Sequence, residues 1–309
     1  MDTLKSLIAA EALQPGDPRV TDFARAIIAP FGETARAVIF YGSCLREAQL
    51  DGLMLDFYVI VSDYAAAYRA ANKAGWMARA NALIPPNVFP FEHDGLAAKY
   101  AVLSAADFDR ECGPDAKSIS VLARFAQPTR LVWSSDEDAR QSVLAAVAQA
   151  APTLIEWTLP VTSGGAGSPE DLWKGAFALT FGAELRAERT DRSARIVDSD
   201  PERYYQFGLR SLQLIAQKRG VGPNGEVPLV MAPEDMARWW RRMQRKGKLL
   251  SVVRLAKASA TFAGGVDYIA WKINRHAGTD IVIKPWQRKH PLLAAISLLP
   301  RLLRSGAVR

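Results

Sequence analysis

Two short segments of the sequence combine residue types that can hold a triphosphate. The apolar segment ARAVIFYG reads as a buried strand that ends at Gly42 and is followed at once by Ser43. A second apolar segment, Met54 to Val61, carries the single carboxylate of Asp56. Glycine and serine in a turn after a strand let backbone N–H groups and a hydroxyl approach phosphate oxygens. A carboxylate on the neighbouring strand can then hold Mg²⁺ against the same phosphates.

This arrangement resembles polymerase-β-like nucleotidyltransferases, and it departs from them at one position. Their usual second carboxylate would fall two residues after Asp56, where this sequence has Tyr58. A tyrosine does not replace a hard anionic ligand of Mg²⁺. Either another residue supplies the second carboxylate or the chain is an inactive relative of the fold. Gly-Ser turns are common, and a lone aspartate on a strand often only accepts local hydrogen bonds, so these two segments alone leave the function open.

The segments around this pair alternate between strand and helix patterns, which predicts a mixed α/β fold. Further strands are expected at LAAKYAVLS and TRLVWSS. Helices are expected at residues 21–30, 64–82, 118–125 and 136–150.

A change of composition marks a domain boundary just before Ser168. The stretch TSGGAGSPEDLW is rich in glycine and serine, and its Ser168-Pro169 pair is typical of a helix start. Beyond it the sequence predicts one short strand at DIVIKPW and helices at 172–190, 201–219, 233–246 and 250–259. We therefore expect a nucleotidyltransferase domain at 1–160, a mostly helical domain, with a winged-helix-like fold as one option, at 168–283, and a basic amphipathic tail at 284–309.

Basic residues are concentrated near the C-terminus. The net charge is +7, but residues 238–309 hold 16 Lys and Arg against two acids, so the rest of the chain is acidic. Such a segment favours an anionic partner, either nucleic acid or a membrane surface. In the final stretch a short leucine-rich segment is flanked by a tryptophan and bases, which favours the membrane interface. The residues expected to contact lipid are Trp286, Arg288, Lys289, Arg301 and Arg304.

Composition and motifs exclude several other classes of protein. Cys44 and Cys112 lack a CxxC spacing and the three histidines form no HExxH motif, which excludes a disulfide scaffold and the common zinc sites. The first residues lack the pattern of a secretory signal, and no apolar run approaches about 18 residues, so we expect neither export nor a membrane span. The predicted location is cytoplasmic, peripheral on the inner face of the membrane. The alternative is that the final helix packs on the protein's own core.

Five segments, taken in order, give a more specific resemblance. They are YGSCLREAQ, MLDFYVIVSD, the stretch from Asp94 to Ser104, ARFAQP, and FGAELRAERTDRSARIV. Together they resemble the mitochondrial translocator assembly and maintenance family, whose members are phosphatidate cytidylyltransferases, also called CDP-diacylglycerol synthases. The resemblance implies transfer of CMP from CTP to phosphatidate with Mg²⁺, giving CDP-diacylglycerol and pyrophosphate. Members of that family also have one aspartate in the second strand, which accounts for Tyr58.

The resemblance implies roles for four residues near the two strands. Gly42 and Ser43 match the family's phosphate-binding turn, and Asp56 matches its metal-binding aspartate. Lys99 matches a lysine whose ammonium group could neutralise triphosphate charge during transfer. Asp56 and Lys99 are thus implied to be catalytic.

Three further residues are implied by the same resemblance. Glu184 is the implied source of the missing carboxylate for the metal. Arg186 is implied to be catalytic and to bind phosphate, and Arg124 matches another arginine that binds CTP or phosphate. The acceptor lipid is expected between the nucleotidyltransferase domain and the tail.

Departures from the family leave the acceptor open. Ala123 and Gln127 replace a glycine and a lysine of the family's segment, and a His-Tyr-Ser motif has no clear counterpart. A phosphorylated sphingoid base or a ceramide phosphate is therefore the alternative acceptor. A non-catalytic nucleic-acid-binding protein on a nucleotidyltransferase fold is the competing class, although a nucleic-acid partner is the less favoured prediction. The tryptophans that could stack on bases are Trp239, Trp240, Trp271 and Trp286.

Overall fold

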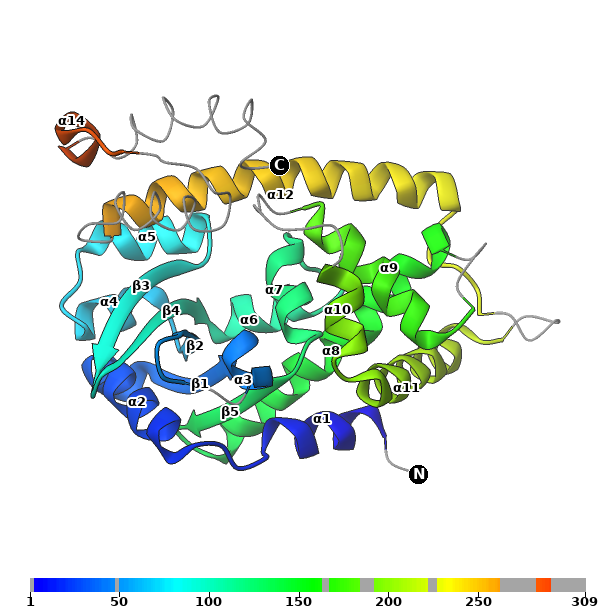
Figure 1. Ribbon diagram of the computed structural model, residues 1–309, viewed down its shortest axis with the longest axis horizontal. Helices are drawn as coiled ribbons and strands as arrows, with labels where there is room; N and C mark the ends of the chain where they lie inside the picture. Colours follow the sequence, from blue (N-terminus) through cyan, green and yellow to red (C-terminus); the bar gives the residue numbers. More distant parts are fainter. Residues whose placement is uncertain are drawn as a thin grey trace.

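A five-stranded mixed sheet forms the centre of the N-terminal half, with strand order β3-β4-β2-β1-β5 (Figure 1). The computed structural model describes residues 3–47, 50–162, 167–183, 192–221, 227–261 and 282–289. The strands are β1 (Ala35–Tyr41), β2 (Met54–Val61), β3 (Asn87–His93), β4 (Leu96–Ser104) and β5 (Thr129–Ser134). β2 and β4 are parallel, and the other neighbours are antiparallel. The predicted mixed α/β class is confirmed.

The register of the sheet aligns Tyr41, Asp56 and Lys99 on three neighbouring strands. Tyr41 of β1 pairs with Asp56 of β2, and Asp56 pairs with Lys99 of β4. Because side chains alternate along a strand, Asp56 and Tyr58 lie on the same face of β2. A carboxylate and an ammonium group therefore come together where β1 ends and β2 begins.

Different helices cover the two faces of the sheet. One face, with Phe57 and Val102, shares a core with α2 (Pro18–Ile28) and α4 (Tyr64–Ala70). The other face, with Tyr58 and Leu103, shares a core with α6 (Ala105–Cys112), α7 (Ile119–Phe125) and α8 (Glu137–Thr162). Burial on both faces explains why β2 and β4 read as almost continuous apolar runs.

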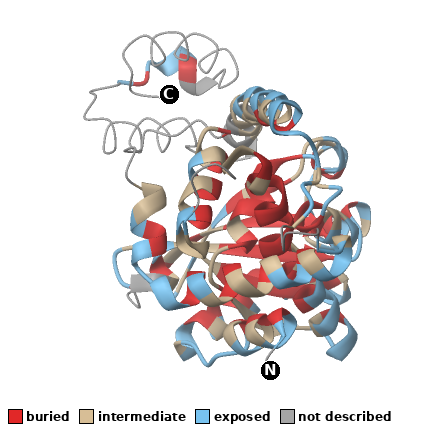
Figure 2. Cartoon of the chain, turned by 90° about the vertical axis from the view of Figure 1, so that its right-hand side faces the viewer, coloured by how far each residue is buried: buried red, intermediate tan, exposed pale blue. Residues whose placement is uncertain are grey.

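The core on the second face continues into the helical C-terminal half. A single cluster of buried side chains includes Tyr58 of the sheet, Trp173 and Trp240, and Figure 2 shows buried residues through the middle of the molecule. The boundary predicted between residues 160 and 168 stays a prediction, as does a winged-helix-like fold. The remaining elements are η1 (Ala29–Thr34), α1 (Leu4–Ala12), α3 (Ser43–Glu47), α5 (Gly75–Leu83), α9 (Pro169–Phe181), α10 (Arg192–Asp198), α11 (Pro201–Arg219), α12 (Pro233–Thr261) and α14 (Pro285–Lys289).

Helix α8 is long and apolar enough, by length and composition, to cross a membrane. Its 26 residues include an 18-residue window that is 72% buried inside the protein. Both the sheet and the helical half pack against it. In this structure α8 is therefore the central core helix.

Two features of the region between β2 and β4 differ from the sequence prediction. The helix predicted at 64–82 is two helices, because Asn72 adopts a positive φ of 50° after α4 and the chain reverses before α5. The strand β3 was not predicted, since Pro90 interrupts its pattern. It forms a hairpin with β4 through Asp94 and Gly95, both with positive φ, which suits a tight two-residue turn.

Four predicted elements beyond residue 135 have different bounds or type. The helix predicted at 172–190 begins at Pro169 and ends at Phe181 as α9. Helix α8 continues past Ala150 through Pro152 and Pro160, because nearly all of this segment is buried. The helix predicted to stop at 246 continues as α12, and Gly247 allows it to pack closely, since a Cβ there would lie 2.3 Å from the Ala183 carbonyl oxygen. A strand is predicted at DIVIKPW, residues 280–286. The structure describes residues 282–289 here and shows no strand among them; a helix begins at Pro285 instead.

Helix α12 is anchored to the sheet side of the molecule by two basic residues. The Arg254 guanidinium donates to the Pro85 carbonyl at 2.9 Å and to the Ser120 hydroxyl at 2.8 Å. The Lys257 ammonium donates to the Ile84 carbonyl. Burial lowers the pKa of Lys257 to about 8, and the charge of Arg254 acts in the same direction. The α12 anchor thus contains an ammonium group that burial makes easier to deprotonate.

The depressed pKa of Lys257 predicts a pH-dependent gain in stability. Between the folded-state pKa of about 8 and the ordinary value of 10.5, the unfolded chain binds more protons than the folded protein. The free energy of unfolding of the wild-type protein should therefore rise with pH in this window, relative to that of Lys257→Met. Urea unfolding of both proteins at a series of pH values measures the difference. A difference that is constant across the window contradicts the prediction.

Candidate functional site

The turn after β1 places a backbone without a side chain directly against a carboxylate. Gly42 has a φ of 99°, a conformation that suits glycine. A Cβ at this position would lie 3.0 Å from Asp56 Oδ2 and 3.4 Å from Asp56 Cβ. Ser43, which is exposed, begins helix α3. The next residue, Cys44, is a buried and packed thiol, whose Sγ lies 3.5 Å from the Met54 carbonyl oxygen.

The Asp56 carboxylate is held between this turn and a lysine of the next strand. Lys99 Nζ lies 3.0 Å from Asp56 Oδ1, and the two side chains are 29% and 19% exposed. Asp56 Oδ1 is buried and accepts no aligned hydrogen bond within the described part of the chain, so the contact with Lys99 is an ion pair. The structure thus brings together four predicted site residues, Gly42, Ser43, Asp56 and Lys99. We call this group the Asp56 site.

Tyr58 is a core residue rather than a part of the Asp56 site. It is only 2% exposed. Its ring lies 5.2 Å from that of Tyr41 and 5.1 Å from that of Phe125. This aromatic cluster fills the face of β2 beyond Asp56 and joins the end of β1 to α7. The position that holds a second carboxylate in polymerase-β-like enzymes is therefore used for packing.

Arg124 lies in the last turn of α7, next to Phe125 of this aromatic cluster. Its Nη1 donates to the Ser120 carbonyl of the same helix at 2.5 Å. The guanidinium is half-buried. Its predicted role in binding phosphate stays a prediction.

Several predicted site residues fall where the structure gives no side-chain description. Glu184 and Arg186 lie outside the described residues, and so do Arg301 and Arg304. The backbone of Arg288 and Lys289 belongs to α14, but their side chains are not described. Trp286, in the same helix, is 44% exposed.

Asp56 fits a divalent cation in the manner of a nucleotide site. Mg²⁺ in such sites takes one or two protein carboxylates and completes its shell with phosphate oxygens and water. The buried Oδ1 of Asp56, with no hydrogen-bond donor aligned on it among the described residues, is a suitable anionic ligand. The same residues contain no cluster of three or more His, Cys, Asp or Glu side chains. Asp56 is thus the described carboxylate at this site, and Glu184, the predicted second ligand, stays a prediction because it lies outside the described residues.

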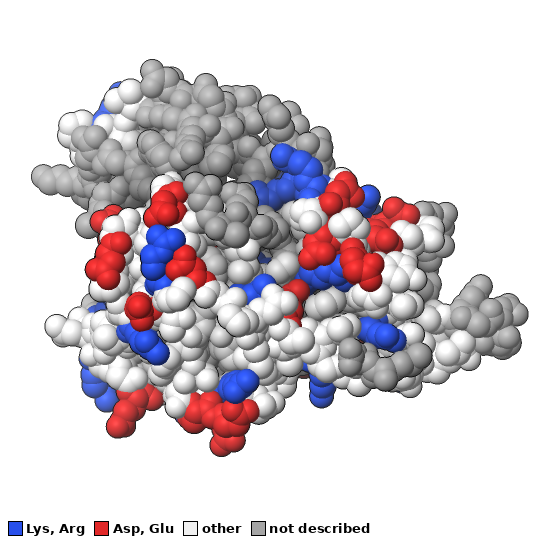
Figure 3. Space-filling view, turned by 60° about the horizontal axis from the view of Figure 1, so that its bottom comes forward, with Lys and Arg blue, Asp and Glu red and all other residues white. Residues whose placement is uncertain are grey.

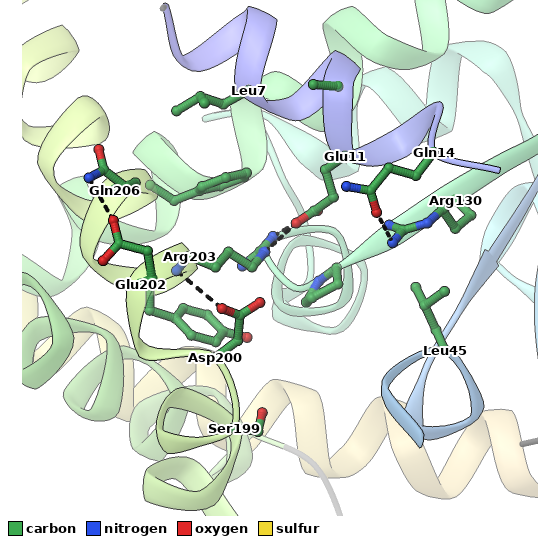
Figure 4. Close-up of a pocket in the computed structure, with 14 residues that line it drawn as sticks. Leu7, Glu11, Gln14, Leu45, Arg130, Ser199, Asp200, Glu202, Arg203 and Gln206 are labelled. Atoms are coloured by element: carbon green, nitrogen blue, oxygen red, sulfur yellow. Dashed lines mark hydrogen bonds and ion pairs between the residues drawn. The ribbon is translucent and has the colours of Figure 1, made fainter. Parts of the chain in front are cut away.

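A pocket of about 510 Å³ lies beside α3 and was not predicted from the sequence (Figure 4). Its walls come from α1, α3, β5 and α11, and Leu45 of α3 is one of its lining residues. Arg130 on β5 and Arg203 on α11 reach into it, and we call it the Arg130 pocket. The sequence signal for Arg130 is a charge inside the apolar strand TRLVW. No local pattern reveals Arg203, because its partner Glu11 is 192 residues away in the chain.

The close approach of Gly42 to Asp56 predicts a specific loss of stability on substitution. Gly42→Ala should cost about 1 kcal/mol for the positive φ and roughly 1–3 kcal/mol more for displacing the carboxylate. Gly52→Ala is the matched control, because Gly52 has a φ of 73° with nothing within 4 Å of the added Cβ. Urea unfolding of the two variants measures the difference. Equal losses would show that the contact with Asp56 does not constrain the turn.

Comparisons with known proteins do not assign this chain to a family. No family model matches the chain, and no curated protein matches it. Among solved structures, a nucleotidyltransferase-like protein from Exiguobacterium sibiricum is 11% identical, with 93% of this chain and 92% of that chain covered and a TM-score of 0.28. A TM-score this low does not establish a common fold. The resemblance to the mitochondrial family therefore depends on the five sequence segments and stays a prediction.

Proposed function

We propose that the protein is a nucleotidyltransferase that transfers CMP from CTP to the phosphate group of a lipid. The observation that carries the proposal is the geometry of the Asp56 site. Backbone from the turn at Gly42 approaches a carboxylate that is itself 3.0 Å from an ammonium group. This combination can bind a triphosphate by backbone N–H groups and positive charge while presenting an anionic ligand for a metal ion.

Each residue of the Asp56 site has a distinct task in this proposal. The N–H groups of Gly42 and Ser43, with the Ser43 hydroxyl, bind phosphate oxygens. Lys99 neutralises charge on the triphosphate and, through its 3.0 Å contact with Oδ1, keeps the Asp56 carboxylate in position. Asp56, together with Glu184, would hold Mg²⁺, which supplies charge stabilisation at the transferred phosphoryl group. Arg124 and Arg186 are proposed to bind further phosphate oxygens.

The acceptor needs little help from a base. A phosphate monoester is already largely ionised near neutral pH, so its oxygen can act directly as the nucleophile. It forms a bond to the α-phosphorus of CTP, and the bond from that phosphorus to the bridging oxygen breaks as pyrophosphate leaves. The protein contributes alignment and charge stabilisation. The sequence resemblance favours phosphatidate as the acceptor, with CDP-diacylglycerol as the product.

Substitution of Asp56 tests the proposed reaction. With CTP, Mg²⁺ and phosphatidate vesicles, Asp56→Asn should lower pyrophosphate release at least about 100-fold, because it removes the anionic ligand. Asp51→Asn is the control, since Asp51 precedes the same strand but is 76% exposed and pairs with Arg19. Undiminished release by Asp56→Asn, or no release by the wild-type protein on any phosphate-bearing lipid, contradicts the proposal.

Helix α12 offers a surface that suits the proposed membrane contact. Its exposed bases include Arg241, Arg242 and Arg245, which have no ion pair within the described residues, and Leu249 beside them is 64% exposed. Helix α14, with Trp286, lies on the same side of the molecule (Figures 1 and 2). The face in Figure 3 instead carries acids and bases interspersed. We therefore propose that α12 and the predicted tail face the anionic membrane together.

Removing charge from α12 tests this membrane contact. Each exposed base contributes about 1 kcal/mol near an anionic bilayer, so Arg241, Arg242 and Arg245 replaced by Gln should weaken vesicle binding by roughly 100-fold at low ionic strength. Replacing Lys5, Arg69 and Lys117 by Gln removes the same charge from other exposed positions and should have a much smaller effect. Cosedimentation with phosphatidylserine vesicles measures both variants. Equal effects of the two triple substitutions, or binding to RNA or DNA but not to vesicles, contradict the proposal.

A further inference from the structure

The Arg130 pocket has the size of a site for a small molecule. Its volume of about 510 Å³ lies within the range of ligand pockets in proteins. It is bounded by α1, β5, α11 and α3, the helix that begins at Ser43. The pocket and the Asp56 site therefore share α3 as a boundary. No residue of the Asp56 site lines the pocket, so the chemistry of its ligand is inferred from the pocket's own side chains.

The floor of the pocket is a buried and neutral ion pair. Arg203, whose side chain is 6% exposed, donates to both carboxylate oxygens of Glu11, at 2.5 and 3.0 Å. Its guanidinium also lies 4.2 Å from the centre of the Phe207 ring. Figure 4 shows this pair in the middle of the pocket. Because each charge neutralises the other, the net charge available to a ligand comes from the two ends.

Arg130 makes one end of the pocket cationic. Its Nη1 donates to the Thr129 carbonyl at 3.1 Å and its Nη2 to the Gln14 side-chain oxygen at 2.5 Å. Both partners are neutral, and no carboxylate in the described part of the chain forms an ion pair with this guanidinium. Burial lowers the pKa of Arg130, although Glu11 opposes the shift, and an arginine nevertheless stays charged near neutral pH. A guanidinium has five N–H donors, and two hydrogen bonds leave others that can donate to an anionic group.

The start of α11 makes the other end acidic. Asp200 caps the helix by accepting from the Arg203 backbone N–H, and Glu202 accepts from the Gln206 side chain. Both carboxylates line the pocket, and neither forms an ion pair within the described residues. In Figure 4, Glu202 and Gln206 lie on the side of the pocket away from Arg130 and Gln14. This end is suited to a cation.

We propose that the Arg130 pocket binds the acceptor, and that the acceptor is a phosphate monoester that also carries an ammonium group. The phosphate would pair with Arg130, and the ammonium group would lie at Asp200 and Glu202. The assignment of this ligand as the acceptor rests on the proposed function. Its phosphate oxygen forms the bond to the α-phosphorus of CTP, and pyrophosphate leaves with the electron pair of the broken bond.

This chemistry discriminates between the candidate acceptors. A sphingoid-base phosphate has both a phosphate monoester and an amine, whereas phosphatidate and ceramide phosphate have no amine. A soluble aminoalkyl phosphate has the same two groups without an acyl chain. The charges of the pocket therefore favour an aminated phosphate over the acceptor that the sequence resemblance favours.

Binding without nucleotide tests the proposal independently of catalysis. Calorimetry with phosphoethanolamine and with glycerol 3-phosphate compares soluble esters with and without the amine. Vesicles that contain sphingosine 1-phosphate or phosphatidate provide the same comparison for lipids. We expect the aminated ligand to bind about tenfold more tightly in at least one of the two pairs. Tighter binding in the soluble pair alone or in the lipid pair alone identifies the source of the ligand.

Two variants assign the binding to the two ends of the pocket. Arg130→Gln should weaken binding of the aminated ligand by about tenfold or more, because it removes the guanidinium that is proposed to pair with the phosphate. Glu202→Gln should reduce only the preference for the amine, by about threefold, since this carboxylate is exposed. Arg36→Gln is the matched control, a strand arginine that pairs with Asp136 outside the pocket.

Three results would overturn the proposal. They are equal affinity for ligands with and without the amine, unchanged binding by Arg130→Gln, and no binding of either aminated ligand. Because CTP is absent, these results do not depend on whether the protein transfers CMP. Conversely, CTP-dependent turnover of phosphatidate with no binding of aminated phosphates would leave the proposed reaction intact and reject the acceptor class.

Discussion

The ion pair between Asp56 and Lys99 fixes the arrangement of the central strands. Asp56 shares its face of β2 with Tyr58 and Ile60, which are both buried, so an unpaired carboxylate there would be costly. Lys99 supplies the opposite charge at 3.0 Å, and this contact depends on the register in which Asp56 of β2 lies beside Lys99 of β4. The Gly42 backbone then closes over the other carboxylate oxygen. One charge therefore positions the end of β1, the start of β2 and the middle of β4.

The helical half extends this constraint beyond the sheet. Tyr58, next to Asp56 on the same face, packs on Phe125 of α7, and the same buried cluster continues through α8 to Trp173 and Trp240. The polar groups lie where this apolar layer ends, with Asp56 19% exposed. Displacement of the helices would therefore uncover the core and disturb the carboxylate together. The Arg130 pocket follows the same pattern, because Arg203 is held by Glu11 and an aromatic ring at the junction between α1 and α11.

Local pattern predicted the elements that carry the Asp56 site, and long-range packing accounts for most of what it did not predict. The strands that contain Tyr41 and Asp56 have strong apolar patterns, and their observed bounds agree with the predicted ones. The neighbour relation of Asp56 and Lys99 could not be derived from pattern, since strand pairing depends on the whole sheet. The predicted helices 233–246 and 250–259 are one helix, in which Gly247 makes a close contact with Ala183. The pair of Glu11 and Arg203 joins opposite ends of the chain and has no local signal.

The central claim is that the turn at Gly42 and Ser43 binds the triphosphate of CTP beside Asp56. The most direct measurement is the backbone amide chemical shifts of these two residues, by heteronuclear NMR, during a titration with CTP and Mg²⁺. We expect saturable shifts at Gly42 and Ser43, with little change at Gly52. Gly52 precedes β2, the strand of Asp56, but its backbone does not approach the carboxylate. Amide shifts at Gly42 and Ser43 that stay constant while CTP saturates another part of the protein would contradict the account.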